Sequence, residues 1–301
     1  MAVSTVSVLH GINWNGSTFI SQITNSRTSP GIQEIVTHAA GAPQPMFAGN
    51  MKQQPVISFD STQIKSLLDL TGSGLAASSG NSDLYYRLTT NRGDRVAAAT
   101  TSHTRLRVAQ ACMLVERISA RDGSEATASG MVYPVYDGTN EPIVPAGSLA
   151  LAGTPTSAEH FTVGPINING SAIAGVQDVT INLGINLTVL TGDGELYPTF
   201  VGVGSYSPVI TARVPTLSWT SIGLNGISDD AVVFLRKVGA LTRAANNATT
   251  HISFTIASSK ISIDDTSAGD NDPAYTTIRI VPISSDGMTA PMVIDTTADI
   301  T

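Results

Sequence analysis

The stretch Val179-Thr-Ile-Asn-Leu-Gly-Ile-Asn-Leu-Thr-Val189 alternates apolar and polar residues without a break. This two-residue period is that of a β-strand with one buried and one solvent-facing side. Eleven residues span roughly 35 Å when extended, about twice the usual strand length. We therefore predict one long strand over 179–189 that ends at the turn Gly192-Asp193-Gly194. Such a strand suits the wall of a ring or barrel, or a long β-sandwich strand, and the pattern alone does not separate these.

Working outward from this stretch, four motifs of the second half repeat motifs of the first half in the same order. The pairs are Ile12–Ser17 with Ile166–Ser171, Pro45–Ser58 with Pro198–Thr211, Ala99–Thr101 with Ala248–Thr250, and Asp137–Val144 with Asp286–Val293. Their offsets are 154, 153, 149 and 149 residues. The shared residues are Gly and Pro, which fix turns, and Val and Ile, which fill strands. We infer an internal duplication, with domains over 1–155 and 156–301 and a boundary near Pro155-Thr156-Ser157.

The composition supports a fold made of strands and turns. Among 301 residues, 42% are hydrophobic and 13% charged, with 27 glycines and 15 prolines. The fold class is therefore predicted as mainly β, with two tandem homologous domains, each a β-sandwich or barrel-like unit with a short helix. Low charge also fits a surface that is largely covered by partners.

Further strands and two helices are predicted from local patterns. The strands are Pro55–Phe59, Leu84–Thr89, Arg105–Ile118, Ser129–Tyr136, Ala158–Val163, Val209–Val214, Ile252–Ile256, Lys260–Ile263, Thr277–Pro282 and Met292–Asp295. One helix covers Thr62–Leu70, capped by Asp60 or Ser61, and the other covers Asp229–Val238, capped by Ser228. The first-copy counterpart of the long strand, Thr24–Ile35, contains Pro30-Gly31 and is predicted to be a loop.

Charge excludes some functions. The net charge is −7; residues 1–150 hold ten basic and ten acidic residues, and residues 151–301 hold six and thirteen. A basic patch that could hold DNA is missing from the sequence, whereas an acidic surface would let a polyanion slide past.

The chemistry of active sites is not evident either. The five histidines, His10, His38, His103, His160 and His251, have no metal-ligand spacing. Asp264-Asp265 and Asp270-Asn271-Asp272 lack EF-hand spacing and are predicted to form a solvated loop. The single cysteine, Cys112, lies in an apolar run and is interpreted as a core thiol. Arg92-Gly93-Asp94 is interpreted as a turn. We predict no enzyme, no cofactor, no metal and no catalytic residue.

The sequence also shows no targeting signal. The N-terminal residues do not form a Lys/Arg-led apolar stretch, and no run of about 20 apolar residues occurs. We therefore expect a soluble protein with no membrane partner. The sequons at Asn15, Asn169, Asn186 and Asn247 carry little meaning without a secretion signal.

The segment Pro45–Gly72 resembles the entry region of tail tube proteins of long-tailed bacteriophages, in which a Pro-containing loop leads into a strand and then a short amphipathic helix. Pro198–Thr211 keeps the loop and strand, but Pro215 stands where the helix would begin. The resemblance implies a virion structural protein, assembled in the host cytoplasm. Trimers would form pseudo-hexameric rings that stack into a tube with an acidic inner wall for transient passage of DNA, and other virion tail proteins would be partners.

Two alternatives remain open: a double-β-domain capsid or other virion shell protein, and a non-viral β-rich binding or adhesion module. Aromatic residues make up only 5%, which counts against the binding module. For the tube, the candidate stacking elements are Met1–Val8 and the segment Asn25–Ala42, which we expect to be an extended loop.

Overall fold

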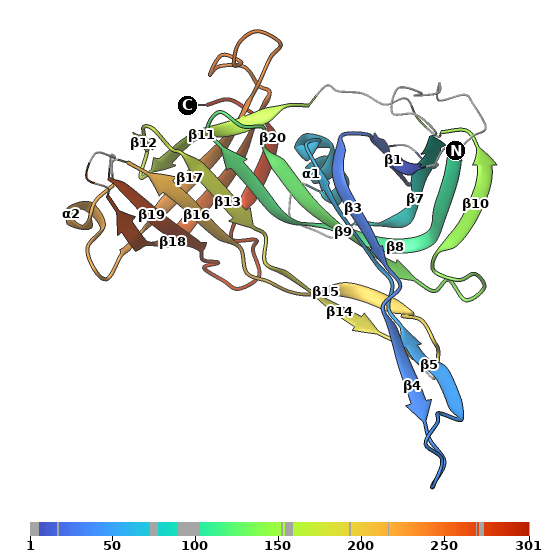
Figure 1. The fold of residues 1–301 in the computed structure, drawn as a ribbon. Helices are drawn as coiled ribbons and strands as arrows, with labels where there is room; N and C mark the ends of the chain where they lie inside the picture. The colour runs from blue at the N-terminus through green and yellow to red at the C-terminus, as the bar shows by residue number, and fades with distance from the viewer. Residues whose placement is uncertain are drawn as a thin grey trace.

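The computed structural model describes residues 6–16, 18–72, 78–89, 103–151, 153, 159–192, 194–215, 217–268, 270 and 274–300. The fold is mainly β, as predicted. Two curved β-bodies lie side by side, and two β-hairpins project from them on the same side (Figure 1). The predicted boundary at Pro155–Ser157 and the Arg92-Gly93-Asp94 tripeptide lie outside the described residues.

The elements of the two halves follow the same order along the chain. The first half contains β1 (Val6–Trp14), β2 (Thr18–Ile20), β3 (Ile23–Ser29), β4 (Ile32–Thr37), β5 (Phe47–Gln53), β6 (Val56–Ser61), α1 (Ile64–Thr71), β7 (Ser78–Thr89), β8 (His103–Arg121), β9 (Thr127–Val135) and β10 (Val144–Leu149). The second half contains β11 (Phe161–Ile168), β12 (Ser171–Ile173), β13 (Asp178–Asn182), β14 (Ile185–Leu190), β15 (Phe200–Tyr206), β16 (Val209–Val214), α2 (Trp219–Ile222), β17 (Ile227–Lys237), β18 (His251–Ser267), β19 (Tyr275–Pro282) and β20 (Val293–Ala298).

The strand pairings repeat as well. In the first half β1 pairs with β2 and β7, β8 with β7, β9 and β10, β6 with β3 and β9, and β4 with β5. The second half has the corresponding pairings among β11 to β20. All are antiparallel. Even the Asn-Gly turns match, because Asn15 and Asn169 both take the positive φ that a tight hairpin turn requires.

The long strand predicted over 179–189 is two strands. Its first part, β13, belongs to the main sheet, and its second part, β14, belongs to a separate hairpin with β15. Gly184 lies between them with φ +59°, and a Cβ there would lie 1.9 Å from the carbonyl oxygen of Ser207. The alternating pattern runs through both strands, so periodicity could not reveal the bend.

The prediction of a loop over Thr24–Ile35 is also wrong, because the glycine in this segment forms a bend between two strands. Strands β3 and β4 occupy it, and Gly31, with φ +58°, is the bend between them. A Cβ on Gly31 would lie 2.0 Å from the carbonyl oxygen of Gln54. The first half therefore has the same strand arrangement as the second, and Asn25–Ala42 is mostly strand rather than an extended loop.

One predicted helix is confirmed and the other is wrong. The helix α1 begins at Ile64 and ends at Thr71, close to the predicted range. The Ser61 hydroxyl accepts a hydrogen bond from the Gln63 backbone N–H, 3.1 Å away, just before its first turn. The predicted helix over 229–238 is strand β17, which pairs with both β11 and β18. The helix of the second half is instead the one-turn helix α2, which lies before β17 and after Pro215.

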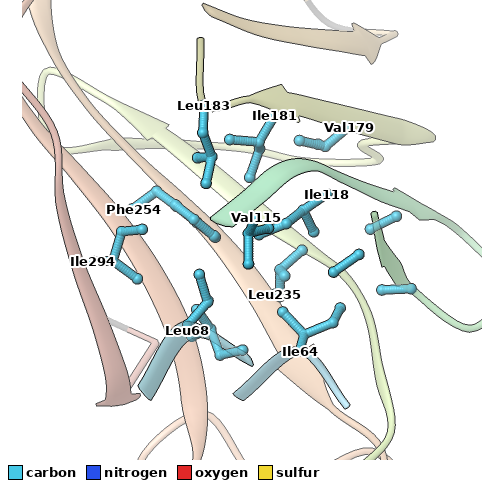
Figure 2. Close-up of a cluster of buried hydrophobic side chains, with 14 of the residues drawn as sticks. Ile64, Leu68, Val115, Ile118, Val179, Ile181, Leu183, Leu235, Phe254 and Ile294 are labelled. Atoms are coloured by element: carbon cyan, nitrogen blue, oxygen red, sulfur yellow. The ribbon is translucent and has the colours of Figure 1, made fainter. Parts of the chain in front are cut away.

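Buried side chains from both halves form one contiguous hydrophobic core. Ile64 and Leu68 of α1 point toward Leu235, Phe254 and Ile294, which belong to the second half (Figure 2). The helix of the first half thus closes part of the core of the second.

Candidate assembly surfaces

The two halves are joined by a strand pair, the internal joint, formed by β13 of the second half and the end of β8 in the first. The opposed residues are Asp178 with Arg121, Val179 with Ala120, Thr180 with Ser119, Ile181 with Ile118, and Asn182 with Arg117. Backbone bonds flank the pair, since Leu183 N donates to Glu116 O at 2.9 Å and Asp122 N donates to Gln177 O at 2.7 Å. Ile118 and Ile181 are fully buried there, so the joint is part of the core.

Polar contacts of α1 form a second link between the two halves. The Lys65 ammonium donates to the Thr296 hydroxyl at 2.9 Å, and that hydroxyl donates to the Asp69 carboxylate at 2.7 Å. The Ser66 backbone N–H donates to the carboxylate of Glu159 at 3.1 Å. These contacts fix the helix of the first half on elements of the second.

A third contact connects the projecting hairpins, named here the first arm (β4 and β5) and the second arm (β14 and β15). The tip of the second arm rests on the base of the first, where Gln53 N donates to Leu196 O at 2.8 Å. Tyr136 N also donates to Pro198 O at 2.8 Å, and the rings of Tyr136 and Tyr197 lie 6.0 Å apart. The halves therefore touch at the sheet, the helix and the arms.

Each half also has one sheet edge that corresponds to an edge of the internal joint and that is open. The counterpart of β13 is β3, which pairs with β6 on one side. The counterpart of the β8 end is the Asp265–Ser267 end of β18, which pairs with β19 on one side. Within the described ranges, no strand pairs with the remaining edge of either segment. Residues 264–268 are all exposed, whereas Ile118 and Ala120 at the internal joint are buried. Open edges of this kind are sites of strand addition.

Both arms carry exposed apolar side chains. Phe47 and Phe200 hold equivalent positions and are 57% and 52% exposed. Each ring lies over the glycine two residues further on, where a Cβ would come within 2.8 Å of the ring. This explains the repeated Phe-x-Gly motif. Other exposed apolar residues of the arms are Ile32, Val36, Met46, Met51, Leu190 and Val203. The arms are thus extended apolar surfaces held away from the main body (Figure 1).

The chemistry-bearing residues noted in the sequence do not meet in one site. His103 and His251 are fully buried at equivalent starts of β8 and β18. The His251 ring accepts from Lys237 N at 3.0 Å and donates to Ala245 O at 2.8 Å, while His103 Nδ1 lies 3.2 Å from Leu149 O. The two rings therefore tie the starts of β8 and β18 to the chain segments beside them. Sequence reasoning treated all five histidines as scattered and missed this pair, although their offset of 148 residues would have shown it.

The other candidates lie apart. Burial raises the pKa of the Cys112 thiol, which favours the unreactive protonated form. The His160 ring contacts the Glu125 carboxylate through Nδ1 at the surface. Asp264 and Asp265 lie on β18, and in the described part of the chain no three His, Cys, Asp or Glu residues gather as metal ligands. Among the helices that the structure describes, none is long and apolar enough to cross a membrane.

No known protein-family model matches the chain, and no curated protein sequence matches it. We therefore infer the function from the assembly surfaces.

Proposed function

We propose that the chain is a self-assembling structural protein whose copies join edge to edge into rings, and that these rings stack into a bacteriophage tail tube. The observation that carries the proposal is the internal joint, together with the open edges of β3 and β18. One chain already joins two similar halves through β8 and β13, and it leaves the matching pair of edges open. A heterologous contact of this kind, repeated from copy to copy, closes into a ring if the rotation permits.

The proposed tube has three copies of the chain in each ring. Eight strands form one continuous path, β3-β6-β9-β8-β13-β16-β19-β18, in which a set of four occurs twice. Three chains give six halves, and eight strands in each of three chains make a barrel of 24 strands. Closing the sheet would remove its open edges, which otherwise invite aggregation.

In the proposed ring, the solvent-facing side of this eight-strand sheet lines the channel. Its charged residues include five arginines, one lysine, three aspartates and one glutamate, namely Arg27, Arg117, Arg121, Arg213, Arg279, Lys260, Asp60, Asp178, Asp265 and Glu116. Charges of both signs alternate with Ser, Thr and Asn. This is not the acidic wall that the resemblance implies; the negative charge of the second half lies largely elsewhere. DNA passage would then depend on the dispersal of the arginines among acidic and neutral neighbours.

The arms supply the contact between rings in this proposal. Both project on the same side of the body and expose apolar surface, which a second ring would cover. Candidate stacking residues therefore lie in the arms, and the segment Met1–Val8 remains a prediction because residues 1–5 fall outside the described ranges.

The test is light scattering after size-exclusion chromatography, with negative-stain electron microscopy of the purified chain over a range of concentrations. We expect trimers that appear as six-lobed rings with a central hole, and hollow tubes at high concentration. Closed shells or flat hexagonal sheets would favour the capsid alternative. A monomer at every concentration would contradict self-assembly and favour the binding-module alternative.

A further inference from the structure

The two halves can be compared residue by residue at their sheet edges, because their strand registers coincide. Ile57 of β6 lies opposite Val132, which lies opposite Met113 of β8. In the second half Ile210 lies opposite Ile280, which lies opposite Ile261 of β18. Both long strands then bulge at the same place, after Val115 in β8 and after Ile263 in β18. Position 118 of β8 therefore corresponds to position 266 of β18.

The internal joint then fixes a register for the open edges. Since Ile181 corresponds to Thr28, its partner Ile118 translates into Thr266. The translated pairs are Ser26 with Ala268, Arg27 with Ser267, Thr28 with Thr266, and Ser29 with Asp265. Each pair joins one copy of the chain to another.

We propose that β3 of one copy pairs antiparallel with residues 265–268 of β18 in a second copy, in this register, to form the external joint. The side-chain matches at the external joint differ from those at the internal joint, so β3 does not fit the place of β13, and β13 does not fit the place of β3. This inference rests on the proposed function and adds the identity of the contact and the rule that orders the halves.

The central pair of each joint is matched in polarity. At the internal joint Ile181 and Ile118 are both fully buried and apolar. At the external joint the pair is Thr28 and Thr266, and cross-strand Thr–Thr pairs form hydrogen bonds. The Thr28 hydroxyl is buried without a hydrogen-bond partner in the isolated chain, and Thr266 is exposed. Rotation of the Thr28 side chain toward the open edge would let Thr266 of a second copy supply the missing partner, whereas a misplaced strand would oppose Thr and Ile.

The charges of the two joints differ in sign at one corresponding position. The β8 edge carries Glu116, Arg117 and Arg121, and β13 brings Asp178 opposite Arg121. On the β18 edge Asp264 corresponds to Glu116, but Asp265 stands where β8 has Arg117, and β3 brings Arg27. In the proposed register Arg27 lies opposite Ser267 and diagonal to Asp265, within reach of a long side chain.

Exchanging the strands would place like charges together. On β8, Arg27 would lie opposite Ser119, with Arg117 and Arg121 on its two diagonals. On β18, Asp178 would lose the Arg121 that lies opposite it at the internal joint, since position 121 corresponds to Gly269. Such repulsive contacts exclude wrong partners. The halves therefore alternate around the ring.

Cysteine cross-linking tests the register. Directly opposed Cα atoms lie about 5.5 Å apart or less, within the range of about 4.4–6.8 Å that a disulfide spans. We expect Thr28→Cys with Thr266→Cys to give disulfide-linked oligomers under oxidation. Thr28→Cys with Ala268→Cys, shifted by two residues, and each single variant should remain largely monomeric on a non-reducing gel. Equal linking by the shifted pair would overturn the proposed register. So would a failure of the matched pair to link, provided that the wild-type chain forms rings.

Charge exchange tests the matching rule. Arg27→Glu or Asp265→Lys alone should raise the concentration needed for half-assembly about tenfold, and the two together should restore it to within about threefold of wild type. Lys260→Glu, an equal charge change on β18 away from the open edge, should have little effect. Circular dichroism checks that each variant is folded.

If the wild-type chain forms rings and the double variant is no better than the singles, the charge rule is wrong and the proposed function survives. If the wild-type chain is a monomer throughout, both fail.

Discussion

At the scale of single residues, the bends at Gly31 and Gly184 decide where each half stops contributing to the main sheet and starts its arm. Each bend combines a left-handed φ with a backbone carbonyl about 2 Å from where a Cβ would lie. A side chain at either position requires both an unfavourable backbone angle and a shift of the neighbouring strand.

We expect Gly184→Ala to lower the free energy of unfolding by about 1–3 kcal/mol, because the alanine would take a strained φ and collide with Ser207. Urea denaturation monitored by circular dichroism measures the change. Gly147→Ala is the matched control, since no atom lies within 4 Å of its Cβ position. Equal stability of the two variants would refute the bend as described.

The Asp137 and Asp286 loops give a pH prediction. The Asn140 side-chain amide and the backbone N–H groups of 139 and 140 donate to the Asp137 carboxylate, and the backbone N–H groups of 289 and 288 donate to Asp286. These hydrogen bonds hold the pKa of both carboxyls below the usual range. A lowered folded-state pKa adds stability above the unfolded-state pKa of about 3.9 and loses it as the pH falls through the folded value.

Wild type should therefore be more stable than Asp286→Asn at neutral pH, and the difference should shrink as the pH falls below about 4. Denaturation midpoints of both proteins at several pH values measure this difference. A difference that is constant with pH would show that the carboxylate charge is irrelevant to the loop.

At the scale of elements, the proposed assembly assigns ring stacking to the arms and ring formation to the sheet edges. Phe47→Asp or Val36→Asp places a charge on an exposed apolar arm surface and should leave the fold and the rings intact while abolishing tubes. Electron microscopy distinguishes rings from tubes. Leu241→Asp, at an almost fully exposed position outside the arms, is the control. Tubes of normal length from the Phe47 variant would contradict the role of the first arm.

Sequence patterns predicted the elements in which the local apolar pattern agrees with the tertiary packing. Val209–Val214 matches β16, and the amphipathic spacing of Ile64, Leu67 and Leu68 predicted α1. The pattern failed at β17, where acidic residues at the start and Arg236-Lys237 at the end imitate a helix. There, pairing on both sides by β11 and β18 decides the structure, and no local pattern contains that information.

The candidate assembly surfaces were predictable only in part. The repeat motifs indicated a duplication and a ring, but the motifs consist of turn and core residues. The joint itself is formed by β8 and β13, which are neighbours in space and distant in sequence, and the sequence gives no register for such a pair. The two-domain division stays a prediction, because one sheet and one core run through both halves.

At the scale of the whole molecule, the halves depend on each other. Residues of α1 bury apolar surface in the second half, and Ile118 and Ile181 bury each other across the joint. We expect residues 1–153 and 159–301, produced separately, to be poorly stable and to form a one-to-one complex when co-expressed. Co-purification from a single affinity tag, followed by thermal denaturation, checks this. Two halves that are each as stable as the whole chain would show that the joint contributes little.

The internal joint also changes the statistics of closure. In a ring of three such chains, half of the six joints are formed by a single polypeptide during folding. Tethering gives those joints an effective concentration far above that of free subunits, and association forfeits translational freedom for three bodies instead of six. A chain that carries one joint inside itself can close its ring at a concentration where six separate halves would remain dispersed, and the joint left open can then stay weak enough to correct a misplaced copy.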